Sequence, residues 1–304
     1  MKSSRTLGSK IHGSLMFLPY LVLLFAWAIY PLYIAITKSL EPSRPVPDGG
    51  IGNYLFVLED FRFWPAVLNV SLFLAIYLPA MLIVVAGMSL LLDTLKPRVT
   101  VPLRLAYLVP ATITGSVAVL VWYFMLEPTF SPFAGAMEQI GWVQGTDVFN
   151  RENLPWIFAL IAFSTGAGNW IVIQYGSLQS IPDELLEAAK IDGANSWQTA
   201  VSIKLPLIRK YLIYMLILAF AAAIQIFVEP YLMSSVPSAL GLANDWSLNQ
   251  LAYNLAFRGT NLAAASALSF MLLIVCLILA LFIIYGTDFF DEADLKKRKV
   301  KEGK

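Results

Sequence analysis

Six stretches of the chain are strongly apolar, carry no charged residue and are bounded by charges or turn-forming residues. Each is about as long as the roughly 20 apolar residues that a helix needs to cross the hydrocarbon core of a membrane. The pattern therefore predicts an all-α membrane protein with six transmembrane helices. We place these spans at about residues 15–36, 66–92, 105–126, 155–175, 211–228 and 263–285.

A seventh uncharged stretch, residues 230–244, is too short to span a membrane and is interrupted by Pro230, Pro237 and Gly241. Irregular backbone of this kind is tolerated near a membrane only where protein or water surrounds it. We expect a loop or a re-entrant segment here.

Residues 1–13 form a leader that carries Lys2, Arg5 and Lys10 before an apolar run, which is how a secretory signal begins. Ala26 and Ala28 also match a small-x-small cleavage site. The apolar run continues past this site for about 22 residues, which is long enough to span. We therefore expect an uncleaved anchor, a transmembrane domain over residues 14–286 and a basic tail over 287–304.

Basic residues predict the orientation. With both chain ends on the cytoplasmic side, 16 of the 21 Lys and Arg residues lie in the leader, the tail and the segments after the second and fourth spans. Cytoplasmic loops of membrane proteins carry such an excess of Lys and Arg. We expect a multi-pass protein of the bacterial cytoplasmic membrane with both termini in the cytoplasm.

Composition agrees with a membrane protein and excludes several classes of function. The chain is 58% hydrophobic and 13% charged with a mean hydropathy of +0.70, whereas soluble domains have about 25% charged residues. A net charge of +1 gives no field that would attract nucleic acid. One cysteine, Cys276, and one histidine, His12, exclude an internal disulfide and Cys- or His-cluster metal sites.

The inside loop over residues 178–209 has the pattern of a helical hairpin. Ser180 is a candidate cap for a helix that starts at Pro182, with Asp183 and Glu184 in its first turn. Gly193 falls where a left-handed residue should end this helix.

A second helix should follow in the same loop. Asn195 or Ser196 can cap it, Trp197 and Ile203 lie on its apolar side, and Pro206 is expected to mark its end before the fifth span. Periodicity alone leaves open whether this hairpin merely covers the helix bundle or is a docking surface. Ala188, Ala189 and Gly193 would permit close approach, and Glu187, Lys190 and Asp192 offer polar contacts beside them.

This loop also resembles a known motif. The pattern E-A-A-x-x-x-G, followed after nine residues by I-x-L-P, is present as Glu187, Ala188, Ala189, Gly193, Ile203, Leu205 and Pro206. It resembles the EAA loop of the membrane subunits of bacterial ABC importers. The longer string from Gly176 to Ala194 is similar to the carbohydrate-uptake branch, which includes maltose, multiple-sugar and glycerol-3-phosphate permeases. Y-P-L-Y-I-A-I-T-K-S-L from Tyr30, G-N-Y around Asn53 and A-S-A-L-S from Ala265 agree, so the similarity covers residues 15–285.

The resemblance implies a type I importer (MetI-like) fold in which the EAA loop is a cytoplasmic coupling helix. Glu187 would meet a basic residue of an ATPase, with Asp192 beside it. The chain has no G-x-x-x-x-G-K-[ST] phosphate loop, so we expect no enzyme activity and no cofactor of its own. In this family ATP and Mg²⁺ are bound by an ATPase dimer, which works with a second six-span subunit and an extracytoplasmic binding protein. The first-subunit type fits this chain better than the partner type.

Polar residues inside spans are candidates for the substrate path, although helix–helix hydrogen bonding is the more ordinary role for each. Counting from Leu205 and Pro206 along the fifth span, the positions that contact sugar in maltose-type relatives correspond to Ala219 and Ala223. This departure puts a maltose-like set of contacts in doubt. The candidates on this path are Asn169, Gln174, Ala219, Ala223 and Gln225.

No span has an ionisable residue at its middle, and Glu229 lies at the outer end of the fifth. A neutral sugar or oligosaccharide therefore fits best, with glycerol-3-phosphate or another small polar solute as the alternative. An ATP-independent six-span carrier would be expected to show a midplane charge or an internal repeat, and the sequence has neither. A membrane scaffold that only recruits a soluble partner is a third class. The segment from Ser234 to Gly241 departs from the glycine-rich segment usual in sugar permeases.

Overall fold

The computed structural model describes residues 17–113, 115–236 and 245–286. All regular elements in these ranges are helical. Five helices are long and apolar enough to cross a membrane, and a bent pair adds a sixth crossing if it counts as one span. This is an all-α membrane fold. The leader 1–13, the tail 287–304 and the segment 237–244 lie outside the described residues.

The chain divides into two compact units, residues 1–63 with 252–273 and residues 64–251 with 274–304. The first unit holds the apolar helix Phe17–Ser39, which ends in α2 (Tyr30–Ser39), followed by α3 (Gly52–Glu59). It also holds the π-helical turn η4 (Asn254–Arg258) and the start of α15 (Leu262–Gly286).

Asn53, from the G-N-Y segment, organises the turn between α2 and α3. Its amide nitrogen donates to the carbonyl oxygens of Ser39 at 3.0 Å and Glu41 at 2.8 Å, and its side-chain oxygen accepts from Ser43 Oγ at 3.0 Å. Gly49 closes the same turn at φ +60°, where an added Cβ would come within 2.6 Å of the Leu40 carbonyl oxygen. This turn therefore requires a glycine.

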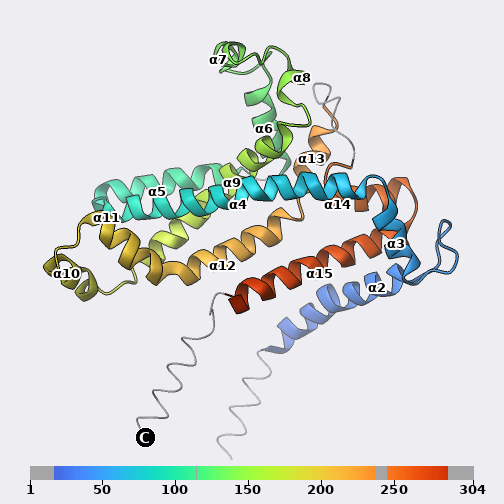
Figure 1. Ribbon diagram of the computed structural model, residues 1–304, viewed down its shortest axis with the longest axis horizontal. Coiled ribbons are helices and arrows are strands. Elements are labelled where there is room, and N and C mark those ends of the chain that lie inside the picture. The colour runs from blue at the N-terminus through green and yellow to red at the C-terminus, as the bar shows by residue number, and fades with distance from the viewer. Residues whose placement is uncertain (1–16, 114, 237–244, 287–304) are drawn as a thin grey trace, which may run out of the picture. The chain divides into compact units, whose positions relative to one another are not determined.

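The second unit contains the elements that carry the candidate site. Its long helices are α4 (Phe63–Thr94), α5 (Pro97–Thr112), α9 (Leu154–Leu178) and α12 (Leu205–Ala223). Figure 1 shows α4, α5, α9 and α12 running along one direction, with α10 at one end and α13 towards the other. The shorter elements are α6 (Ser116–Leu126), α7 (Ala134–Gln139), α8 (Gly145–Val148), α10 (Asp183–Ile191), α11 (Ser196–Gln198), η2 (Thr199–Lys204), α13 (Val228–Met233) and α14 (Leu248–Tyr253).

Close backbone approach places α9 against α5. A Cβ added at Gly168 would lie 1.8 Å from the Tyr107 carbonyl oxygen, so only glycine permits this contact. Further along α9, the fully buried Phe158 packs edge-to-face on Trp246 with ring centroids 4.6 Å apart. Asn69 on α4 donates to the Trp246 carbonyl oxygen at 3.2 Å. Small residues and hydrogen bonds at helix contacts are typical of membrane bundles, where no hydrophobic effect drives helices together.

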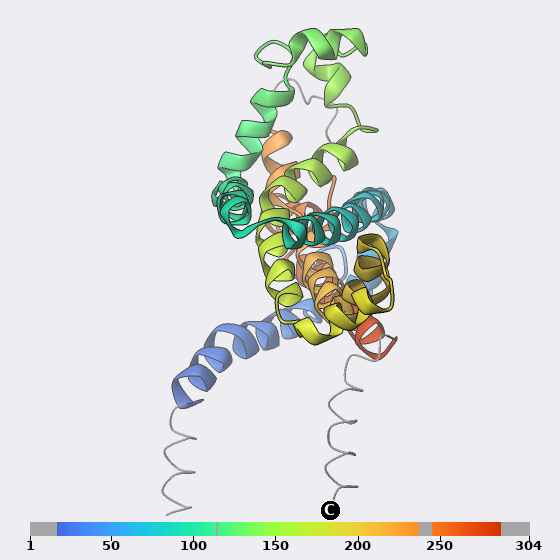
Figure 2. The same cartoon turned by 90° about the vertical axis from the view of Figure 1, so that its left-hand side faces the viewer.

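The predicted third span is not one straight helix. It corresponds to α5 and α6, which are bent by 97° relative to each other. Gly115 has φ +61°, and an ordinary α-helix cannot continue through that conformation. Figure 2 shows the result, with α5 seen nearly end-on while α6 stands upright. The apolar sequence indicated a span and did not indicate this bend.

Candidate functional site

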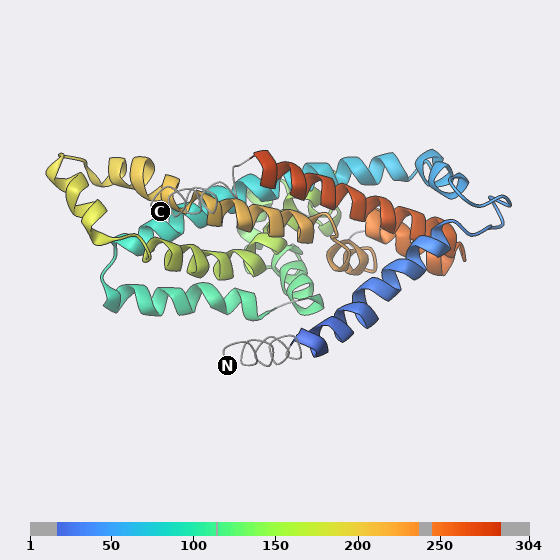
Figure 3. The ribbon, with the colours of Figure 1, turned by 90° about the horizontal axis from the view of Figure 1, so that it is seen from below.

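The EAA segment, residues 187–206, begins inside α10 and lies at the far end of the second unit's long helices (Figure 3). Helix α10 starts at Asp183, with Pro182 at the cap position and no side-chain cap. The predicted cap by Ser180 is wrong, because its hydroxyl donates to the Ser177 carbonyl at 2.7 Å and completes the end of α9 instead. Asp183 and Glu184 occupy the first turn, where the helix dipole favours acids.

Gly193 ends α10 as predicted. It has φ +81°, its N–H donates to the Lys190 carbonyl at 3.1 Å, and the N–H of Ala194 reaches back to the Ala189 carbonyl at 2.9 Å. This is the left-handed termination that glycine favours. No atom lies within 4 Å of an added Cβ, so the backbone conformation alone demands glycine here.

The second helix of the hairpin also begins as predicted. Asn195 Oδ1 accepts from the Gln198 N–H at 2.8 Å, and the Gln198 side chain accepts from the Asn195 N–H at 2.8 Å. This reciprocal pair is a capping box, in which two otherwise unpaired donors at the helix start are satisfied.

Pro206 does not end that helix, so the prediction of a second helix separate from the fifth span is wrong. The chain runs from α11 through the π turn η2 into α12, and the Leu205 N–H bonds to the Ala200 carbonyl, five residues back. Pro206 then occupies one of the first positions of α12, where a missing N–H costs least. The wider π turn resets the hydrogen-bond register just before the proline. The second half of the EAA segment is thus the start of the fifth span.

The surface of the EAA segment combines an acid, small residues and large apolar side chains. Glu187, Ala188, Asp192 and Gly193 are exposed, together with Pro206, whereas Ile203 and Leu205 are half-buried. Ala189 is 6% exposed, so of the two alanines predicted to permit close approach only Ala188 lies at the surface. Ile191 and Trp197 are 86% and 76% exposed. Exposed apolar side chains gathered beside polar ones are typical of a protein interaction surface.

Asp93, at the end of α4, joins three elements at the base of this hairpin. Its carboxylate forms an ion pair with Lys204 in η2 and accepts a hydrogen bond from Gln179 Nε2, at the end of α9, at 2.6 Å. The Asp93 and Lys204 side chains are 8% and 17% exposed. Charge-assisted bonds of this kind are among the stronger ones in proteins. Sequence reasoning used Asp93 only to end the second span.

Gln174 acts as a tie between helices. It is fully buried, and its Nε2 donates to the Tyr211 carbonyl of α12 at 3.0 Å. It lines none of the cavity described below, so the structure does not place it with the other predicted path residues. The same holds for Asn169, which is exposed, and for Ala219, which is buried.

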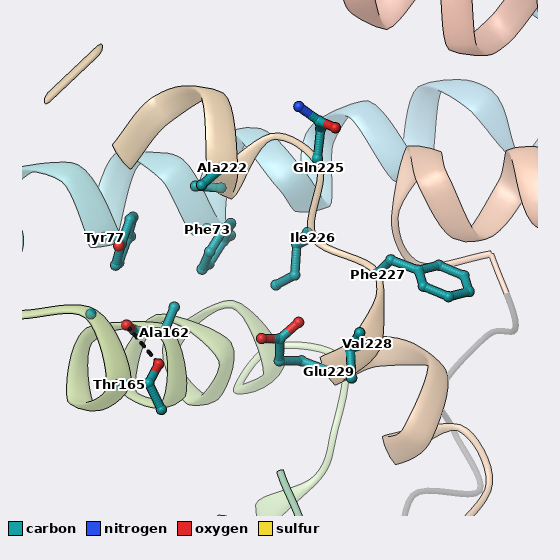
Figure 4. A pocket seen from close by; sticks show the side chains of 12 residues that line it. Phe73, Tyr77, Ala162, Thr165, Ala222, Gln225, Ile226, Phe227, Val228 and Glu229 are labelled. Carbon is teal, nitrogen blue, oxygen red and sulfur yellow. Dashed lines mark hydrogen bonds between the residues drawn. The ribbon is translucent and has the colours of Figure 1, made fainter. Parts of the chain in front are cut away.

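A cavity of about 330 Å³ lies among α4, α9 and the junction of α12 with α13. Ala223 and Gln225 line it, as do Phe73, Tyr77 and Glu229. The rings of Phe73 and Tyr77 are stacked, with centroids 5.5 Å apart and 13° between their planes. Figure 4 shows the Glu229 carboxylate directed into the space between α9 and the Ile226 side chain.

Gln225 lies at the break between α12 and α13, and its polar groups serve the backbone. Its Nε2 donates to the Ala221 carbonyl at 3.0 Å, which satisfies an acceptor freed by the end of α12. Its own carbonyl accepts from Asn249 Nδ2 at 2.8 Å. Figure 4 shows the side chain directed away from Glu229. Gln225 therefore lines the cavity, but its side-chain amide is directed away from Glu229.

Glu229 and Tyr77 supply the polar atoms of the cavity. Thr165 also lines it, but its hydroxyl bonds to the carbonyls of Ile161 and Ala162 at 3.1 and 3.2 Å. Within the described residues, Glu229 forms no salt bridge and Tyr77 makes no hydrogen bond through its hydroxyl. Sequence reasoning missed both residues. An acid at the end of an otherwise uncharged run was the one signal that could have identified Glu229.

Comparison with known proteins gives a consistent family. Residues 13–287 match the family described as binding-protein-dependent transport system inner membrane component. The sulfoquinovosyl glycerol transport permease SmoG of Agrobacterium fabrum is 30% identical over 75% of this chain and 75% of its own length. The lactose transport permease LacF of Rhizobium radiobacter is 25% identical over 91% of this chain and 94% of its own.

A solved structure gives the fold independently. A chain of a bacterial ABC transporter involved in the import of the acidic polysaccharide alginate superposes with a TM-score of 0.77 at 17% identity, over 92% of this chain and 96% of that one. At this identity the likeness concerns the fold alone. The match over residues 13–287 establishes that this chain belongs to the family of binding-protein-dependent transport system inner membrane components.

Proposed function

We propose that this chain is a membrane-spanning subunit of a bacterial ATP-driven importer and forms part of the path of a sugar or oligosaccharide. Membership of the inner-membrane family supports the transport role, and relatives named for lactose and sulfoquinovosyl glycerol support a carbohydrate cargo. The chain works as a transporter subunit without enzymatic activity. ATP and Mg²⁺ would be bound by a partner ATPase dimer.

The observation that carries the coupling role is the form of the EAA segment. Glu187, Ala188 and Asp192 are exposed on a short helix that Gly193 terminates, beside the exposed Ile191 and Trp197. We assign this surface to the ATPase, with Glu187 facing a basic residue of that partner. Because η2 continues directly into α12, movement of the docked hairpin would pass along the fifth span without a flexible link.

The remaining partners are a second six-span subunit and an extracytoplasmic binding protein that delivers the sugar. The excess of Lys and Arg in the leader, the tail and the EAA side of the bundle supports cytoplasmic termini. Transport would then follow from a difference in docking free energy between inward- and outward-facing states.

The first test is gentle detergent purification of the tagged chain, with mass spectrometry of the proteins that co-elute. We expect an ATPase and a second six-span subunit, and we expect Glu187→Arg to lose the ATPase while retaining the six-span partner. Glu152→Arg is the matched control, because Glu152 is equally an exposed acid and lies outside the EAA segment. Equal recovery of the ATPase with both variants would reject the docking assignment.

The competing function is an ATP-independent carrier. Purified chain that transports sugar in proteoliposomes without ATP would support the carrier and contradict the importer. Glycerol-3-phosphate or another small polar solute is the alternative cargo. Candidate binding proteins discriminate between these, since the one that stimulates ATP hydrolysis by the complex identifies the solute that it carries.

A further inference from the structure

The cavity beside α13 has an unbalanced charge. Glu229 is the one acidic residue among those that line the cavity, and the lining includes no Lys, Arg or His. The ion pairs among the described residues join Lys38 to Glu41, Arg62 to Asp60 and Lys204 to Asp93, and none of these involves Glu229. Within the described residues, this carboxylate therefore has no basic side chain as a partner.

The position of Glu229 is fixed by the fold. Helix α12 ends at Ala223, and the chain turns through residues 224–227 before α13 begins at Val228. The bonds of Gln225 to Ala221 and Asn249 fix this turn, and the Gln225 side chain is directed away from Glu229. As a result Glu229, in the first turn of α13, is directed towards α9 (Figure 4).

The opposite wall is chemically suited to a sugar ring. The Phe73 and Tyr77 rings, which stack on each other, form an apolar part of the wall on α4, and the Tyr77 hydroxyl adds one donor near Gly166 on α9. An apolar lining with a few convergent polar groups is the usual composition of a small-molecule site. A carboxylate accepts hydrogen bonds from hydroxyl or ammonium groups and has no proton to donate to another anion.

We propose that Glu229 makes this cavity a charge filter, which accepts neutral or cationic sugars and disfavours sugars that carry a carboxylate or another anion. The proposal rests on the proposed function and specifies the class of substrate. Likeness to importers of the acidic polysaccharide alginate and of sulfoquinovosyl glycerol, whose sugar carries a sulfonate, therefore does not extend to an acidic cargo here.

The test measures direct sugar binding to the complete importer in nanodiscs, purified through a tag on this chain, without the binding protein. The probes are methyl glucoside, glucosamine and methyl glucuronide, compared by saturation-transfer difference NMR at about pH 6.5, where the free amine is protonated and the free glucuronide carboxylate is ionised. A like charge within several ångströms in a partly desolvated site predicts glucuronide binding about tenfold weaker than glucoside binding.

Glu229→Gln should bring the glucuronide-to-glucoside ratio close to one, because it removes the charge and keeps the shape. Glu229→Asp keeps the carboxylate and should preserve the wild-type order of the three sugar affinities. That result would show that the charge causes the effect. Glu152→Gln removes an exposed acid outside the cavity and should leave the ratio unchanged. Monodisperse elution of each variant verifies that the complex is intact.

Three results would overturn the filter: equal binding of the three sugars by the wild type, an unchanged ratio in Glu229→Gln, or a changed ratio in Glu152→Gln of the same size. None of these three results would contradict the proposal that the chain forms part of a sugar path. Absence of binding for all three sugars, in an importer that its binding protein still stimulates with a different solute, would instead contradict the proposed cargo and the filter with it.

Discussion

The EAA segment and the Glu229 cavity differ in how they are built. The EAA segment is assembled from neighbours in sequence: Gly193 bonds to Lys190, and Asn195 exchanges hydrogen bonds with Gln198. The cavity brings together α4, α9 and α13, whose residues are distant along the chain. Local capping chemistry specifies the first, and helix packing specifies the second. A substitution in the hairpin should therefore change coupling without disturbing the helix bundle. A substitution at the cavity wall should act by changing how the helices pack.

The largest effect should come from Gly168, which sets α9, a wall of the cavity, against α5. Gly168→Ala puts a Cβ within bonding distance of the Tyr107 carbonyl oxygen, so the helices must separate. We expect a loss of at least about 1–3 kcal/mol, the usual cost of overpacking. Fluorescence-detected size-exclusion chromatography after heating should show a lower melting temperature.

Gly176→Ala is the control for that substitution. Gly176 lies on the same helix with nothing within 4 Å of its added Cβ, so its melting temperature should stay at or above that of the wild type. Equal destabilisation by both substitutions would show that the α5–α9 contact is not as close as described.

Gly193→Val should have the next largest effect and should act on coupling. A β-branched residue at φ +81° costs about 1–2 kcal/mol or more, which deforms the end of α10. We expect the complex to assemble, with ATP-driven uptake falling to a small fraction of wild type. Gly176→Val provides a matched valine at an open helical position. Full uptake by Gly193→Val would contradict a rigid-lever role.

Asp93→Asn should have an intermediate effect that is specific to the hairpin base. It leaves the Lys204 ammonium, 17% exposed, without its charged partner, at a cost of about 1–3 kcal/mol. In Asp93→Asn, the amount of sugar imported per ATP hydrolysed should fall by a larger factor than the affinity of the complex for the ATPase. Adding Lys204→Met removes the stranded charge and should restore part of the stability in a double-mutant cycle. Additive losses would show that the two side chains do not interact.

The smallest effect should arise outside both regions, at the Asp60–Arg62 pair before α4. Hydrogen bonds from the Arg62 guanidinium to the Asp60 carboxylate lower the pKa of Asp60 below its ordinary value of about 3.9. The stabilisation is present above that ordinary pKa and is lost as pH falls through the lower folded-state pKa. Arg62→Gln should cost about 0.5–1 kcal/mol at neutral pH, with a smaller loss near pH 3 in thermal melts. Uptake should not change.

The roles of Pro206, Gln174 and Gln225 differ from those predicted, each for a physical reason. Pro206 was expected to end a helix because an α-helical register cannot accommodate it, yet the π turn before it provides another register. Gln174 and Gln225 attracted attention as polar residues in apolar spans, and both prove to bond backbone carbonyls. In a bundle without water, an amide satisfies a nearby carbonyl before it serves a substrate.

The sequence by itself determined the helical membrane class and the helix end at Gly193, and it narrowed the start of the next helix to Asn195 or Ser196, because apolar length and end-capping are properties of short segments. Tertiary structure alone decided the bend at Gly115, the Gly168 contact and the pairing of Asp93 with Lys204, 111 residues away. It also turned Glu229 from the end of a span into the wall of a cavity. These features depend on which helices meet, and hydrophobic patterns in a uniformly apolar solvent do not encode that choice.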